Sequence, residues 1–182
     1  MNGRTHITYG FNLVLIFVAI LYYIAYKSVI YDAPAILSFV VGGMFGTLWP
    51  DFDIHWGGIK SHRNTITHSA IFPLVGTIAY AWTPDVFARS LLMFVSFGIM
   101  THLLFDLFES DVEGRTFVTR WARRINIFLH GKVGGSFKGP GSKWANKHER
   151  AYLLVHAGIC LGCTLLLFWG IINGIDIDGW IF

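Results

Sequence analysis

Long apolar segments separated by short polar ones make up most of this chain. Residues 7–26 contain no charged side chain. At about 1.5 Å per residue they are long enough, as a helix, to cross a hydrocarbon core of about 30 Å. The pattern therefore predicts an all-α polytopic membrane helix bundle forming a single domain over residues 1–182. About five transmembrane helices are expected, at residues 7–26, 34–49, 66–82, 90–108 and 151–172.

The second predicted helix has clear boundary signals. Pro34 suits the first turn of a helix and Pro50 marks its end, because proline lacks the N–H that a helix interior requires. Within this helix, Gly42 and Gly46 form a G-x-x-x-G pattern, which permits close approach of a neighbouring helix.

Composition agrees with a membrane protein. Hydrophobic residues make up 54% of the chain and charged residues 14%, with a mean hydropathy of +0.53. Soluble domains usually contain about 25% charged residues. Cys160 and Cys163 lie in an apolar run, so we interpret them as packing residues rather than as a disulfide or redox pair.

Most of the 14 Lys and Arg residues fall in the predicted loop at residues 109–150. Its first part has apolar side chains at helical spacing opposite arginines, which predicts an interfacial amphipathic helix at about residues 117–128. The following glycine- and lysine-rich residues 131–143 predict a mobile loop. Cytoplasmic loops are enriched in basic residues. We therefore expect a multi-pass membrane protein with this loop and the N-terminus in the cytoplasm.

Candidate ligands gather in the polar stretch of residues 49–69, between the second and third predicted helices. An unpaired charge near hydrocarbon costs about 2.5–3.5 kcal/mol, so such a cluster needs a partner. On the predicted fourth helix, His102 and Asp106 are four residues apart and share one face. The predicted topology brings all of these residues, and His6 of the first helix, to the cytoplasmic face. The candidate metal ligands are His6, Asp51, Asp53, His62, His68, His102 and Asp106.

Imidazole and carboxylate ligands suit zinc best, with manganese or iron as alternatives, and this number of carboxylates allows one or two ions. Such a site activates water and polarises phosphoryl or carbonyl oxygens, which indicates hydrolysis. Arg63 could bind a phosphate, or it could be an ordinary juxtamembrane charge. Asp53 could act as the general base. We interpret His130, His148 and His156 as structural residues.

Four motifs resemble those of a known family. The sequences RTHITYG, GTLWPDFDIHWGGIKSHRNTITHS and THLLFD contain a TH near the start, PDxD, HRxxTHS and HxxxD. Together they resemble the YdjM-like family, whose members are inferred to be metal-dependent hydrolases of the bacterial inner membrane. The resemblance covers roughly residues 1–108, with Asn64 in place of the glycine of the usual HRG. It implicates the seven candidate ligands and Arg63. The motif arrangement is similar, more loosely, to zinc-dependent phospholipases C.

These observations favour a membrane metallohydrolase acting on a phospholipid or lipid-linked phosphoester at the cytoplasmic interface. One alternative is a non-catalytic scaffold in which the metal is structural. Another is a metal or proton transporter, although the polar residues cluster on one side of the membrane. We expect membrane lipids as partners and no nucleic acid, because membrane charge bias explains the basic residues.

Overall fold

The computed structural model describes residues 33–57, 63–81, 83–107 and 136–173. Within these ranges the fold is all-α, as predicted, with an isolated β-bridge between Asn64 and Lys138 and no β-strand. The predicted first helix, the predicted amphipathic helix at 117–128 and residues 131–135 of the glycine-rich loop lie outside the described residues.

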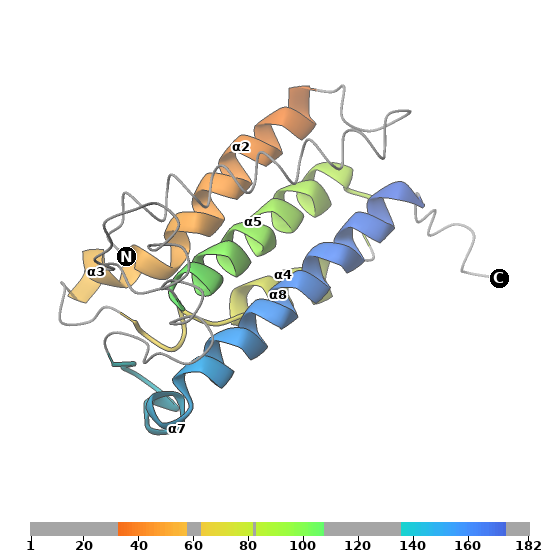
Figure 1. Ribbon diagram of the computed structural model, residues 1–182. Helices are drawn as coiled ribbons and strands as arrows, with labels where there is room; N and C mark the ends of the chain where they lie inside the picture. Colours follow the sequence, from red (N-terminus) through yellow and green to blue (C-terminus); the bar gives the residue numbers. More distant parts are fainter. Residues whose placement is uncertain (1–32, 58–62, 82, 108–135, 174–182) are drawn as a thin grey trace, which may run out of the picture.

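Figure 1 shows the helices of the described residues, coloured in chain order. They are α2 (Ala33–Leu48), the 3₁₀ helix η1 (Trp49–Asp51), α3 (Phe52–Gly57), α4 (Ile71–Tyr80), α5 (Val86–Phe105), α7 (Ser142–Lys147) and α8 (Glu149–Ile172).

Helix α5 is the centre of the bundle. It packs against α2 on one side and α8 on the other, and α4 contacts both α5 and α8. Ile99 and Leu103 of α5 and Leu153 and Leu167 of α8 are completely buried in the resulting core. Figure 1 shows α3, the C-terminal end of α5 and α7 at the same end of the bundle.

Glycines allow α2 and α5 to approach closely, as the G-x-x-x-G pattern predicted. A Cβ atom added at Gly42 would lie 2.7 Å from the Leu91 carbonyl oxygen, and one added at Gly46 would lie 2.3 Å from the Val95 carbonyl oxygen. On the facing surface, a Cβ at Gly98 would lie 2.8 Å from the Thr47 amide nitrogen. The two backbones are therefore in direct contact.

Two described helices, α5 and α8, are long and apolar enough to cross a membrane. The five-helix bundle is thus not confirmed within the described ranges, since α2 and α4 have 16 and 10 residues against the roughly 20 that a span requires. Large apolar side chains are nevertheless exposed along α2, α4 and α8, including Val41, Val75, Ile78, Val155 and Leu165. This surface is suited to contact lipid.

Among the helix boundaries that differ from the prediction, three have a local reason. Helix α4 begins at Ile71 rather than at residue 66, because Thr67 and Ser69 bond to backbone carbonyls in turns. The chain remains helical beyond Pro50 through η1 and α3, so the polar stretch is only partly a loop. Helix α5 begins at Val86 because the Asp85 carboxylate caps it by accepting from the Ala88 N–H at 3.0 Å.

Candidate metal centre

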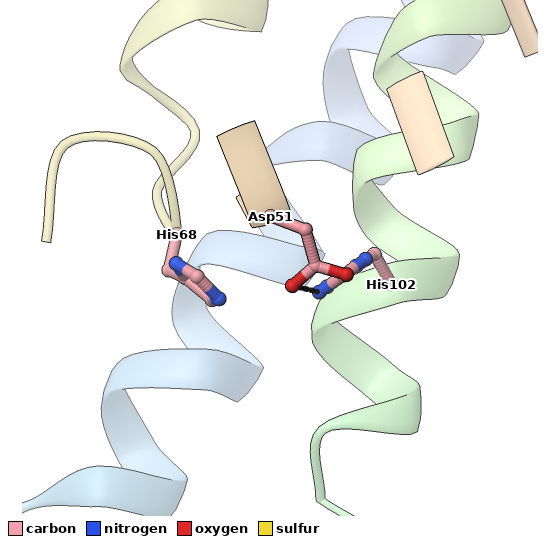
Figure 2. Close-up of side chains that lie close together, drawn as sticks. All are labelled: Asp51, His68 and His102. Atoms are coloured by element: carbon pink, nitrogen blue, oxygen red, sulfur yellow. Dashed lines mark ion pairs between the residues drawn. The ribbon is translucent and has the colours of Figure 1, made fainter. Parts of the chain in front are cut away.

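Three separate segments supply the candidate ligands. Asp51 lies on η1, His68 on the turn that precedes α4, and His102 on the last turn of α5. Figure 2 shows the three side chains converging on one point between these elements. Their ligating atoms all lie within 4.8 Å of one another, and both histidines are fully buried. These three residues form a group that could hold a metal ion.

The orientation of His102 is set by the backbone of α2. Its Nδ1 atom lies 2.8 Å from the carbonyl oxygen of Thr47. A carbonyl oxygen only accepts hydrogen bonds, so Nδ1 carries the proton and Nε2 is the acceptor atom of the neutral ring. Metal-ligating histidines commonly donate their other ring N–H in this way. The Nε2 atom faces Asp51 Oδ1 at 3.7 Å.

The His68 ring has an equivalent arrangement. Its Nδ1 atom lies 3.2 Å from Thr67 Oγ1 and 3.6 Å from Asp53 Oδ2, whereas its Nε2 atom lies 3.5 Å from Asp106 Oδ2. The oxygen atoms of Thr67 and Asp53 therefore lie beside Nδ1, and Nε2 faces Asp106. The two imidazole rings meet edge to face with their centroids 5.6 Å apart.

Three separations between side-chain atoms of this site are close to those around a bound cation. The same Asp106 Oδ2 atom also lies 3.9 Å from His102 Nε2, so Asp106 is a fourth candidate ligand. With zinc–ligand bonds of about 2.0–2.2 Å, a tetrahedron places its ligand atoms about 3.3–3.6 Å apart. The observed separations of 3.5, 3.7 and 3.9 Å are close to those values. They exceed the roughly 2.7–3.2 Å of good hydrogen bonds.

Asp53 faces the outer side of His68. Its Oδ2 atom accepts hydrogen bonds from the Asn64 backbone N–H at 2.7 Å and from Thr67 Oγ1 at 3.1 Å. The carboxylate thus holds the turn that carries His68 and lies beside the ring nitrogen that points away from the group. Carboxylates that orient a ligating histidine in this way are common in metal sites.

Arg63 lies at the edge of the group. Its Nη2 atom is 3.6 Å from Asp106 Oδ1, and its guanidinium carbon lies 5.9 Å from the centre of the Phe137 ring. Arg63 is 7% exposed, and its Nη1 atom has no hydrogen-bond partner among the described residues. A buried guanidinium N–H in this state is suited to bind an anionic oxygen.

The turn that follows Arg63 explains the departure from the HRG motif. Arg63 itself has the left-handed backbone conformation, with a φ of 68°, and Asn64 does not. The Asn64 side chain accepts a hydrogen bond from the Ile66 N–H at 2.9 Å, which closes an Asx turn. Asparagine at this position therefore stabilises the turn, and Arg63 rather than Asn64 adopts the left-handed conformation.

The end of the glycine-rich loop covers one side of the group. The Thr65 N–H donates to the Lys138 carbonyl at 2.9 Å, and the Lys138 N–H donates to the Arg63 carbonyl at 3.0 Å. Phe137 is 2% exposed, and its ring packs edge to face against His68. The Asn146 side chain fixes Phe137 by bonding both its N–H and its carbonyl.

The structure thus brings together six of the eight residues predicted from sequence: Asp51, Asp53, Arg63, His68, His102 and Asp106. The other two, His6 and His62, lie outside the described residues. Sequence reasoning missed Thr47, Thr67 and Phe137. Thr67 lies within the THS motif and gave a signal, whereas Thr47 acts through its carbonyl and Phe137 through long-range packing, neither of which residue type reveals.

The fold and site define a helical protein that has two helices long and apolar enough to cross a membrane and a histidine and aspartate group that could bind a metal. The family model described as "YdjM inner membrane protein" matches residues 1–170. The chain therefore belongs to the YdjM inner membrane protein family, as its motifs suggested. No curated protein and no solved structure matches it.

Proposed function

We propose that this protein is an integral membrane, metal-dependent hydrolase that acts on a phospholipid or a lipid-linked phosphoester. The observation that carries the proposal is the convergence of Asp51, His68 and His102 from three segments, with the buried Arg63 beside them. Two neutral imidazoles and a carboxylate favour zinc, with manganese or iron as alternatives. A bound ion of this kind would polarise a phosphoryl oxygen and lower the pKa of a bound water.

The protein's own residues have separate roles in this proposal. Asp51, His68 and His102 hold the ion, and Asp53 orients His68. These contacts favour an orienting role for Asp53 over the ligand and base roles that its sequence position suggested. Asp106 Oδ2 faces both imidazoles and can accept a proton from water, while Asp106 Oδ1 holds Arg63. Arg63 binds a phosphoryl oxygen through Nη1.

Location supports a lipid substrate. The group lies at the end of the bundle that also holds α3, the C-terminal end of α5 and α7. Ile66, Ile71 and Phe72, on and just after the His68 turn, are exposed apolar side chains. A lipid whose chains contact such a surface would present its head group to the end of the bundle. The proposed orientation places this end at the cytoplasmic face of the inner membrane.

The direct test is hydrolysis by purified, metal-loaded protein against a panel of phospholipids, lipid phosphates and isoprenoid-linked phosphates. We expect release of phosphate or of a phosphorylated head group from one class. Arg63→Gln is expected to lower kcat/KM about 100-fold or more without loss of metal, since Arg63 stabilises charge in the transition state. Lys143→Gln, which removes an exposed positive charge from α7 at the same end, is the matched control. Absence of hydrolysis of every panel member by metal-loaded protein would refute the lipid phosphoesterase proposal.

A second candidate function is a membrane scaffold with a structural metal. Asp106 favours it, because a fourth protein ligand would close a tetrahedral site. The two candidates differ in what metal removal does. A scaffold would lose folded structure on chelation and would hydrolyse nothing, whereas the hydrolase would lose activity reversibly.

A further inference from the structure

The turn that carries Arg63 and His68 is held from outside by α8. Residues 63–70 form turns and contain no regular helix, so neighbouring elements must fix their position. Two α8 side chains bond to the backbone of this turn. The Tyr152 hydroxyl donates to the Thr65 carbonyl at 2.6 Å, and His156 Nδ1 accepts from the Ala70 N–H at 3.2 Å.

These two contacts lie on either side of His68. Tyr152 and His156 are four residues apart, so both project from the same face of α8. Their rings pack edge to face with centroids 4.4 Å apart, which fixes each relative to the other. The Tyr152 bond is made at Thr65, three residues before His68, and the His156 bond is made at Ala70, two residues after it. The backbone on both sides of the candidate ligand is thereby attached to a helix that supplies none of the candidate ligands.

We propose that Tyr152 and His156 are positioning residues that hold His68 in the geometry required for metal binding. This inference rests on the metal site proposed above. Neither side chain is a ligand; each acts through a backbone group of the turn. Without them, His68 would be held less firmly in place relative to His102 and Asp51, although all three ligand residues would still be present.

The test measures metal binding rather than catalysis. Zn²⁺ affinity is determined by competition with a chromophoric chelator for detergent-purified wild type, Tyr152→Phe and His156→Leu, alongside the visible spectrum of the Co²⁺-loaded proteins. We expect each variant to bind Zn²⁺ about 3- to 10-fold more weakly and to show an altered Co²⁺ absorption band, since loss of outer contacts to a ligand commonly weakens metal binding.

Thr164→Val is the matched control. Thr164 is a buried α8 residue whose hydroxyl donates to the Cys160 carbonyl at 2.9 Å, away from the turn. Its removal is expected to lower thermal stability about as much as Tyr152→Phe does, while Zn²⁺ affinity and the Co²⁺ spectrum stay as in wild type.

The outcomes separate this inference from the proposed function. Wild-type affinity and spectra in both Tyr152→Phe and His156→Leu would overturn the positioning role and leave the metal site standing. Equal weakening in all three variants would also overturn it, because the effect would then be general destabilisation. Failure of wild type to bind either ion would overturn both the positioning role and the metal site beneath it.

Discussion

His102 illustrates how one backbone contact selects a ligand atom. Because the Thr47 carbonyl can only accept, Nδ1 must donate to it, and Nε2 is left to face Asp51 and Asp106. His68 has Thr67 and Asp53 on its Nδ1 side and Asp106 on its Nε2 side. At the scale of single residues, the site therefore depends on oxygen atoms of Thr47, Thr67 and Asp53, which orient the imidazole rings rather than ligate an ion.

Asp53→Asn tests this dependence. The neutral amide weakens the bonds from the Asn64 N–H and Thr67 and removes the charge beside His68 Nδ1, while the ligands remain in place. We expect metal affinity to fall about 10- to 100-fold, measured by chelator competition. Asp85→Asn is the control, since asparagine caps a helix as well as aspartate does and Asp85 lies at the other end of α5. An unchanged affinity in Asp53→Asn would contradict the orienting role.

At the scale of elements, the contact between α2 and α5 aligns two parts of the site. Gly46 and Gly98 bring the helix backbones together next to Thr47, whose carbonyl bonds His102. A side chain at Gly46 would thus separate the helices and also displace the group that orients a ligand.

Gly46→Ala is expected to lower the free energy of unfolding by about 1–3 kcal/mol, because the added Cβ would overlap the Val95 carbonyl. Thermal unfolding in detergent measures the effect. Gly158→Ala is the matched control: no atom lies within 4 Å of its added Cβ, and alanine favours a helix more than glycine. Equal stability of the two variants would show that the close helix contact is unimportant.

At the scale of elements, the sequence predicted most of the described helices. Apolar length located α2, α5 and α8, and the G-x-x-x-G pattern identified the surface through which α2 contacts α5. Apolar length placed the start of α4 too early, at residue 66. The reason is that apolar Ile66 and Ile71 flank a turn whose hydroxyl and amide side chains bond to the backbone. The helix predicted at residues 90–108 also began one residue after Arg89. Arg89 is instead buried in α5 and donates to the carbonyls of Gly170 and Thr83.

The candidate site was largely predictable because histidine, aspartate and arginine carry their chemistry in the residue type. Their spacing alone placed His102 and Asp106 on one face of a helix. The predicted topology placed both at the same membrane face as the stretch that contains Asp51 and His68. The cover formed by Phe137 and the support from Tyr152 and His156 arise from contacts over long sequence distances. No local pattern encodes such contacts, so an ordinary phenylalanine, tyrosine or histidine gave no signal.

At the scale of the whole molecule, α8 relates the site to the membrane. Its first turns hold the His68 turn, and its last residues lie at the opposite end of the bundle (Figure 1). If α8 spans the inner membrane in the proposed orientation, Lys143 of α7 faces the cytoplasm and Asn173 the periplasm.

Single cysteines at these two exposed positions test the orientation. We expect Lys143→Cys to react with a membrane-impermeant maleimide only in inverted vesicles, and Asn173→Cys only in intact spheroplasts. The wild-type chain is the control, because Cys160 and Cys163 are both buried and should stay unlabelled. Labelling of both positions from one side would contradict a spanning α8, and the reverse pattern would contradict the orientation.

The central claim is that residues from separate segments assemble one metal site, and metal content tests it most directly. Elemental analysis would compare detergent-purified wild type with Asp51→Ala, His102→Ala and the control Asp85→Asn, each reconstituted with metal and dialysed. We predict stoichiometric zinc, manganese or iron in wild type and in Asp85→Asn, and its loss from both site variants. Wild-type protein without metal after reconstitution, or full retention by both site variants, would contradict the account.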